Sequence, residues 1–286
     1  MQFITKTQCF RGSWRDTAQA LYKLPLTFCV TFMLLLIVSY TVDRSPMASF
    51  SRKIAYHGFL CLTTLLTLVV SANLAIRVSR YTLLGETRGT AKGSLQRYLL
   101  LPLITCCGVG ILVPFALFLG FMLIYLLHSF GIANDASTAL FVGGASIAFF
   151  FGGVGYVWVR LSLLYPHIAA GGKLDWRDAW YDSQDHFWEM LAMFICTTLP
   201  ITIVSTVLEI YLPHVFAKLG SAGLLHDIWM FFAIVLHLVN LALCAACSTW
   251  IYRRFAKELQ LPGSRPKSPR LRGPANLHER VKQAAS

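Results

Sequence analysis

Acidic and histidine side chains gather in one short stretch of this chain, LDWRDAWYDSQDHFW at residues 174–188. On a helix, Asp178, Asp182 and His186 would share one face at intervals of four residues, and divalent metal ions accept carboxylates and imidazoles as ligands. Three ligands spread over two turns of one helix seldom converge on a single ion. We therefore expect a solvated or salt-bridged face here, without a catalytic, metal or cofactor site. The expected partners of the acids are Arg77, Arg80, Arg88 or Arg97.

A second polar group lies inside the apolar part of the sequence. His237 and Asn240 stand one helical turn apart in one apolar run, and Glu209 stands in another. Ionisable groups at membrane depth are costly, so these three residues are candidates for a polar path for a proton or a substrate. The competing interpretation is an ordinary hydrogen bond between helices, which contributes about 0.6 kcal/mol.

The composition shows what surrounds these groups. Of the 286 residues, 56% are hydrophobic and 13% are charged, and the mean hydropathy is +0.59. Soluble domains carry about 25% charged residues, so the composition predicts a multi-pass membrane protein. All cysteines except Cys9 lie in apolar runs, where reduced thiols act as small hydrophobic groups.

Six windows contain the roughly 20 mainly apolar residues that cross a bilayer. They cover about 24–42, 54–76, 98–127, 136–160, 187–212 and 228–252. The predicted fold is all-α, a polytopic membrane helical bundle of six transmembrane helices with short cytoplasmic interfacial helices. It would form a membrane domain over residues 1–255, followed at 256–286 by a disordered basic cytoplasmic tail rich in Pro, Gly, Ser and Arg.

Lysine and arginine residues predict the orientation, because they accumulate in cytoplasmic connections. They lie in the N-terminal arm, in the second-to-third and fourth-to-fifth connections and in the tail. The opposite side holds only Arg44, Arg52, Lys53 and Lys218. Both termini are therefore expected in the cytoplasm. The net charge of +12 would then meet anionic head groups of the lipid bilayer, and nucleic acid is not an expected partner.

The stretch 174–188 also has the pattern of an interfacial helix. Its aromatic residues form one stripe at helical spacing and its aspartates form another. A tryptophan-rich face directly before a span is typical of a helix in the head-group region, and the acidic stripe would face a partner loop or protein. The aromatic set is Trp176, Trp180, Phe187 and Trp188, and the acidic set is Asp175, Asp178, Asp182 and Asp185.

Two further patterns concern helix entry and helix packing. Trp-Arg-Asp occurs at 14–16, after Ser13, and again at 176–178, after Asp175; Ser and Asp both suit an N-cap. The repeat favours helical hairpins that each begin with an interfacial helix, although three residues can also match by chance. In the fourth window a stripe of small residues would let another helix approach closely; it consists of Gly144, Ala148 and Gly152.

Residues 159–194, VRLSLLYPHIAAGGKLDWRDAWYDSQDHFWEMLAMF, resemble the signature of a group of bacterial membrane proteins. The group includes the YciC-like proteins and the membrane domain that precedes some glycerophosphoryl diester phosphodiesterases. Where small polar residues usually precede the next span, this chain has 184–186, Gln-Asp-His. The resemblance implies an integral protein of the bacterial cytoplasmic (inner) membrane and does not imply phosphodiester hydrolysis. It is carried by Arg160, Pro166, Trp176, Trp180, Phe187 and Trp188.

The sequence contains no P-loop, no Gly-x-Ser-x-Gly and no His-Glu-x-x-His motif. We therefore expect a non-enzymatic membrane component with a structural, assembly or partner-binding role, whose partner is another protein or a second copy of the chain. The first alternative is a small transporter or permease subunit with a polar path near His237 and Asn240. An intramembrane lipid-processing enzyme is the least favoured alternative.

The predicted topology can be tested with reporter fusions. Fusions after Ser129 and after Gly220 should report the outer side of the membrane, and a fusion at the C-terminus should report the cytoplasm, because the basic connections stay inside. A reversed pattern of reporter activity would contradict the orientation.

Overall fold

The computed structural model describes residues 5–43, 50–86, 93–129, 144, 152–219, 222–256 and 259. Within these ranges the chain is helical and contains no strand, which confirms the all-α prediction. Residues 152–161 are helical, and the helices with defined bounds are α1 (Lys6–Lys23), α2 (Pro25–Asp43), α3 (Phe50–Leu84), α4 (Ser94–Ser129), α6 (Leu164–Ala169), α7 (Trp176–Ser183), α8 (Phe187–Leu219) and α9 (Ala222–Phe255).

Four of these helices are long and apolar enough to cross a membrane. The candidate spans are Pro25–Val42, His57–Leu84, Phe187–Leu208 and Asp227–Phe255, with mean hydropathies of 2.0 to 2.3. A helix suits this environment because it bonds all its backbone groups internally where no water is present. These spans agree with the first, second, fifth and sixth predicted windows.

The other two predicted spans are not established by the described residues. The third, 98–127, falls within α4, which is one helix of 36 residues. The fourth, 136–160, lies largely outside the described residues. A bundle of six spans therefore stays a prediction.

Local sequence signals account for several helix ends. α2 starts at Pro25, where the fixed backbone angle of proline suits a first helical position and its missing N–H leaves no donor unpaired. α3 ends at Leu84, and the following Gly85 has a φ of 70°. The N–H of Gly85 donates to the carbonyl of Tyr81 at 2.9 Å, so this glycine terminates the helix in the left-handed conformation.

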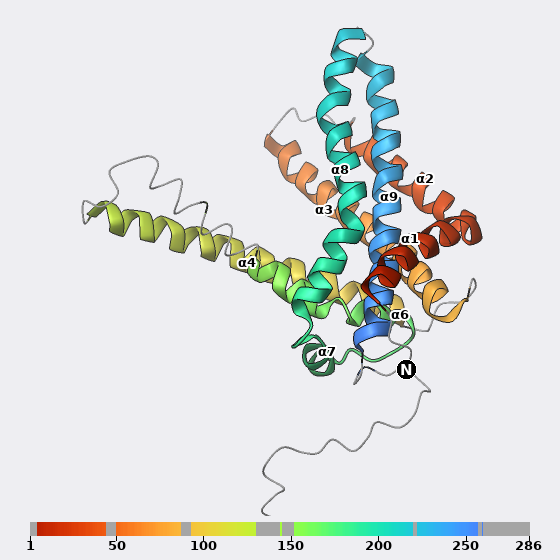
Figure 1. Ribbon diagram of the computed structural model, residues 1–286. Coiled ribbons are helices and arrows are strands. Elements are labelled where there is room, and N and C mark those ends of the chain that lie inside the picture. Colours follow the sequence, from red (N-terminus) through yellow and green to blue (C-terminus); the bar gives the residue numbers. More distant parts are fainter. Residues whose placement is uncertain are drawn as a thin grey trace, which may run out of the picture.

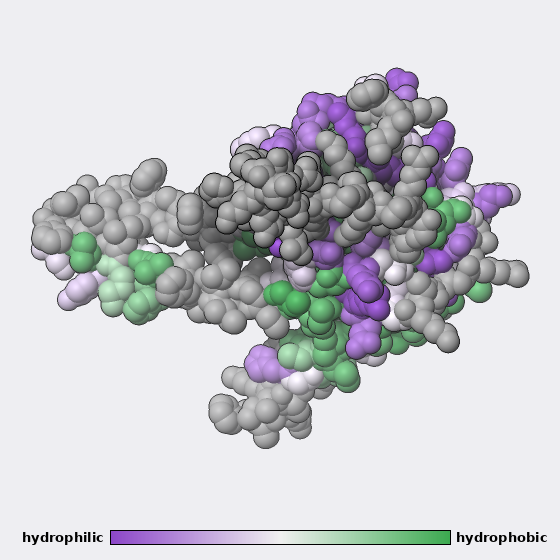
Figure 2. Space-filling model, turned by 90° about the horizontal axis from the view of Figure 1, so that it is seen from below, coloured by the Kyte–Doolittle hydropathy of each residue, from purple (hydrophilic) through white to green (hydrophobic). Residues whose placement is uncertain are grey.

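α8 and α9 form a long antiparallel hairpin, and α9 is the central helix of the molecule (Figure 1). It packs against α1, α2, α3, α6 and α8. α4 leaves this group and extends to one side (Figure 1). α1, α6, α7 and residues 248–255 of α9 lie toward one end of the molecule, and we call this set the platform. Seen from that end, the surface carries broad hydrophilic areas (Figure 2).

α1 lies against α9 through a face of small and polar residues. A capping box starts the helix, because the Thr5 hydroxyl accepts from the Gln8 N–H and the Gln8 side chain accepts from the Thr5 N–H. The buried face consists of Cys9, Gly12, Ser13, Asp16, Thr17 and Ala20. Its small residues let the two helices approach closely: a Cβ at Gly12 would lie 2.4 Å from the Trp250 ring.

The Trp-Arg-Asp repeat occupies different positions in its two helices. In α7 the expectation was right, since Asp175 is the N-cap and accepts from the Asp178 N–H at 3.4 Å. In α1 it was wrong, because Thr5 is the N-cap and Ser13 is buried in the middle of the helix. The two copies nevertheless share one pattern of burial. In each, the tryptophan is half-buried, the arginine is exposed and the aspartate is buried.

The close approach of α1 and α9 predicts a specific sensitivity at Gly12. Gly12→Ala should lower the free energy of unfolding by about 1–3 kcal/mol, because the added methyl group overlaps the Trp250 indole. Thermal unfolding of the purified protein in detergent measures the change. The matched control is Gly58→Ala on α3, where an added Cβ meets nothing within 4 Å. Equal stability of the two variants would contradict the docking of α1 on Trp250.

Candidate functional site

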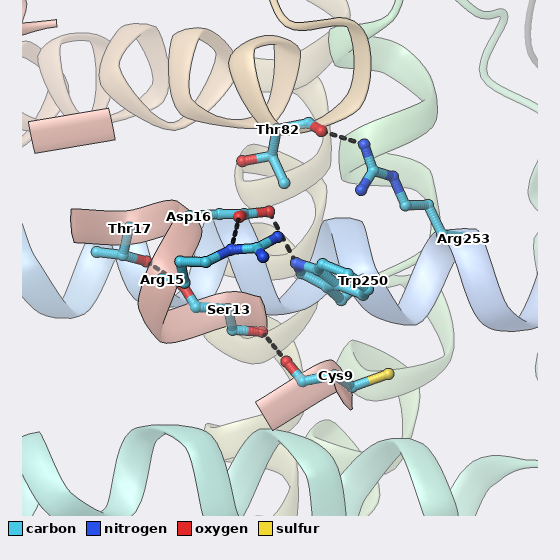
Figure 3. A network of polar contacts seen from close by, with 8 residues as sticks. All are labelled: Cys9, Ser13, Arg15, Asp16, Thr17, Thr82, Trp250 and Arg253. Carbon is cyan, nitrogen blue, oxygen red and sulfur yellow. Dashed lines mark hydrogen bonds and ion pairs between the residues drawn. The ribbon is translucent and has the colours of Figure 1, made fainter. Parts of the chain in front are cut away.

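The densest polar contacts in the described part of the chain lie in the platform. Figure 3 shows one group of them, in which α1 meets the end of α9. The Trp250 indole N–H donates to Asp16 Oδ2 at 3.0 Å, and Arg15 Nε lies 3.4 Å from Asp16 Oδ1. Asp16 is only 8% exposed. A buried carboxylate is costly unless donors surround it, so Trp250 and Arg15 make the burial of Asp16 tolerable.

The same face of α1 bonds its hydroxyl groups internally. Ser13 donates to the carbonyl of Cys9, and Thr17 donates to the carbonyl of Ser13, each at 2.7 Å. Neither hydroxyl hydrogen is therefore left unpaired in this contact. Burial raises the pKa of the Cys9 thiol, although the Arg254 guanidinium beside it acts in the opposite direction. Cys9 is thus a protonated, packed thiol rather than an activated nucleophile.

The two arginines at the end of α9 connect it to other helices. Arg253 donates to the backbone carbonyls of Thr82 and Leu83, in the last turn of α3. These carbonyls have no partner within their own helix, and a cation at a helix C-terminus is electrostatically favourable. Arg254 lies 3.2 Å from Glu189 Oε2 in α8, and Lys6 of α1 lies 3.4 Å from Glu189 Oε1. Glu189 therefore bridges α1, α8 and α9.

A chain of hydrogen bonds links α6, α9, Leu259 and α7. The Tyr252 hydroxyl donates to the carbonyl of Leu259 at 2.7 Å, and its oxygen lies 3.1 Å from His167 Nδ1. Because the phenol hydrogen is used on Leu259, the His167 contact needs the tautomer that carries its proton on Nδ1. The Leu259 N–H donates to Asp182 Oδ2 at 3.1 Å. Leu259 is thus held at both backbone groups, and its side chain is buried.

The turn after α6 is held by arginines and by two glycines. Arg80 donates to the carbonyl of Ala169 at 3.0 Å and Arg97 to that of Gly172 at 3.2 Å, and Arg80 also pairs with Glu86. Gly171 has a φ of 93°, which favours glycine. At Gly172 a Cβ would lie 2.2 Å from the His167 ring, so only glycine fits there.

The buried Arg160 lies between aromatic rings at the start of this region. Its guanidinium carbon is 4.6 Å from the centre of the Tyr156 ring and 4.3 Å from that of Trp180. Desolvated cation–π contacts of this kind contribute about 2 kcal/mol. Arg160 therefore connects the helix at 152–161 to α7, and Trp180 serves as its packing partner.

The expected acidic face of 174–188 is divided by the structure. Asp175 caps α7, Asp178 and Asp182 are buried against the rest of the chain, and Asp185 is exposed. His186 stacks on Phe255, with ring centres 4.7 Å apart. Among the described residues, no group of three His, Cys, Asp or Glu side chains could hold a metal ion.

The expected arginine partners of these aspartates mostly bind elsewhere. Arg77 donates to the Thr27 hydroxyl at 3.2 Å, while Arg80 and Arg97 bind the turn after α6. Arg88 lies outside the described residues. Each guanidinium carries five N–H donors, so these contacts leave room for a carboxylate. The pairing of the aspartates with these arginines stays a prediction.

The aromatic stripe is also divided. Trp176 and Phe187 are half-buried and pack against the core, whereas Trp188 is 76% exposed and Trp180 39% exposed. The outer side of α7 thus presents Trp180, Tyr181 and Arg177. An outward aromatic and basic side with an inward acidic side fits an interfacial helix, and that role stays a prediction.

The structure describes only part of the polar and small residues predicted within the apolar runs. His237 lines a cavity between α2, α3 and α9, whose described lining does not include Asn240. The Asn240 carbonyl oxygen lies 3.9 Å from the thiol of Cys244 in its own helix. The side chain of Glu209 lies outside the described residues. In the predicted stripe of small residues, Ala148 also lies outside the described residues. A Cβ built at Gly144 or Gly152 meets nothing within 4 Å, so no close helix contact is seen at either glycine.

Several residues that hold the platform together were missed by the sequence interpretation. They lie at the end of the sixth span or just after it, where aromatic and basic residues are the ordinary sign of a membrane boundary. That general pattern does not indicate which residues these side chains contact. The run Trp-Ile-Tyr-Arg-Arg at 250–254 is the signal in the sequence that could have pointed to them. The missed residues are Trp250, Tyr252, Arg253, Arg254 and Leu259.

Comparison with known proteins gives no relative: no family model, no curated protein and no solved structure matches the chain.

The contacts of Leu259 predict how Asp182 acts. Asp182→Ala should weaken the attachment of the backbone at Leu259 by about 1.5–3 kcal/mol, since a hydrogen bond to a charged group is lost. Hydrogen exchange of the peptide containing Leu259 measures the change, which should be a faster exchange. Asp185→Ala, at an exposed position of the same stretch, is the matched control. Equal exchange in both variants would show that Asp182 does not hold this segment.

Proposed function

We propose that this chain is a non-enzymatic component of the bacterial cytoplasmic membrane, with both termini in the cytoplasm and a structural, assembly or partner-binding role. The observation that carries the proposal is that carboxylates which could take part in a reaction are bonded to other parts of the same chain. Asp16, Asp182 and Glu189 each bind a group on a different element of the same chain. Carboxylates engaged in this way attach one part of the chain to another, which supports a structural role.

The outer side of the platform supports the choice of a partner-binding role. α7 is fixed from inside by Asp182 and by the stacking of Trp180 on Arg160, so its exposed side keeps a defined shape. Tyr181 is 54% exposed on that side and lies near Arg177, whose guanidinium is 5.7 Å from the Tyr181 ring. Exposed tyrosine and arginine are enriched at the centres of protein interfaces. We therefore place the partner, either another protein or a second copy, at α7.

A transport function is the second candidate, and the cavity beside His237 is the observation that favours it. The expected path needs His237 and Asn240 together. Of these two residues, only His237 belongs to the described lining of the cavity. The transport candidate therefore has weaker support than the structural or partner-binding role.

Site-directed photocrosslinking tests the proposal. A benzophenone amino acid replaces Tyr181, and a second variant carries it at Val204, which is exposed on the candidate span of α8. After irradiation of cells, position 181 should give one protein adduct of defined mass, and position 204 should give none. Adding Arg177→Glu should remove the adduct at 181 because it inverts the charge beside the label.

The mass of the adduct identifies the partner, since a doubled chain mass indicates a second copy. Adducts with lipid alone at position 181, or the same products at 181 and 204, would contradict a partner-binding role for α7.

A further inference from the structure

A cavity of about 600 Å³ lies between α2, α3 and α9, away from the platform. Along α9 its lining runs from Trp229 to His237, which is about 12 Å of helix. On α2 and α3 it is bounded by 35–42 and 60–67. All three segments belong to candidate membrane spans. The cavity therefore lies in the halves of these spans that are farthest from Trp250 and Arg253.

The wall of the cavity is mainly apolar. Leu35, Met230 and Ile234 contribute hydrocarbon surface. The threonines in the wall use their hydroxyl hydrogens on their own helix: Thr63 donates to the carbonyl of Leu60 at 2.9 Å, and Thr67 to that of Thr63 at 2.9 Å. Their oxygens can still accept a bond, and the other polar side chains of the described wall are Ser39, Trp229 and His237.

His237 is the ionisable residue of the described wall. Its imidazole carries one donor and one acceptor, and no described residue forms a hydrogen bond with either. At membrane depth, where water is absent, leaving both unpaired is unfavourable. An occupant with a polar group would satisfy the ring. Toward the platform the bundle is closed, since Leu238 is buried and both Ala242 and Leu243 are fully buried.

We propose that this cavity is a binding site for a lipid of the surrounding bilayer, with a hydrocarbon chain along Leu35 and Ile234 and an oxygen-bearing group hydrogen-bonded to His237. The apolar wall lies inside candidate spans, so the molecule that reaches it comes from the membrane. From His237 toward the platform, α9 is buried at Leu238, Ala242 and Leu243, which fits a retained lipid better than a through path. This proposal does not depend on the role assigned to α7.

A photoactivatable fatty acid with a diazirine in its chain provides the probe. The full chain, purified in detergent, is irradiated with the probe, and the labelled peptides are identified by mass spectrometry. Adducts should concentrate at 35–42, 60–67 and 229–237, and an excess of unlabelled oleic acid should remove them. Labelling that does not saturate, or that spreads evenly over the spans, would overturn the proposal.

Two variants and one control locate the site. Ala233→Trp fills the cavity and should abolish the saturable labelling, and His237→Leu should reduce the apparent affinity about fivefold by removing one hydrogen bond. Val204→Trp, on the exposed side of α8, should leave labelling unchanged.

Thermal unfolding tests whether each variant is folded. The competition by oleic acid is measured in the unaltered chain, so it tests the site independently of the variants. Unchanged labelling in folded Ala233→Trp would exclude the cavity. Unchanged affinity in folded His237→Leu would exclude the assigned hydrogen bond.

Discussion

The last turns of α9 hold the platform together, because they bring hydrogen-bond donors to a place where several elements have unpaired acceptors. Trp250 reaches α1, Tyr252 reaches Leu259, Arg253 reaches the end of α3 and Arg254 reaches α8. An apolar span supplies no such groups along its length, since its backbone is bonded internally. The polar specificity of the bundle is therefore concentrated at one end of its central helix.

This arrangement also gives a role to the charged groups of the platform. α1 and α7 are short helices that each bury part of their surface and expose the rest. Buried carboxylates such as Asp16 and Asp182 help to fix the position of such a helix, since each accepts a bond from a donor on another segment of the chain. The charged groups of the platform thus mainly connect one segment of the chain to another.

Much of the architecture could be predicted from the sequence, because long apolar runs and helix caps are local signals. Four candidate spans, the cap at Asp175 and the helix Trp176–Ser183 required only neighbours along the chain. One continuous helix over 174–188 was wrong, because the chain turns at 184–186 before α8 begins. The platform could not be predicted in the same way. The contact of Asp16 with Trp250 joins residues 234 positions apart, and the sequence of neither helix indicates it. The bonds of Arg80 to Ala169 and of Arg97 to Gly172 likewise join segments far apart in the sequence.

The central position of α9 also has a consequence for the order in which the molecule is made. α1 leaves the ribosome long before α9, yet α9 carries the indole that binds Asp16 and the arginine that binds Glu189. Until α9 has been synthesised, Trp250 is not available to contact Asp16 and Gly12 of α1. Leu259, which engages Asp182, follows later still. The contacts of the platform can thus be completed only after α9 and Leu259 have been synthesised.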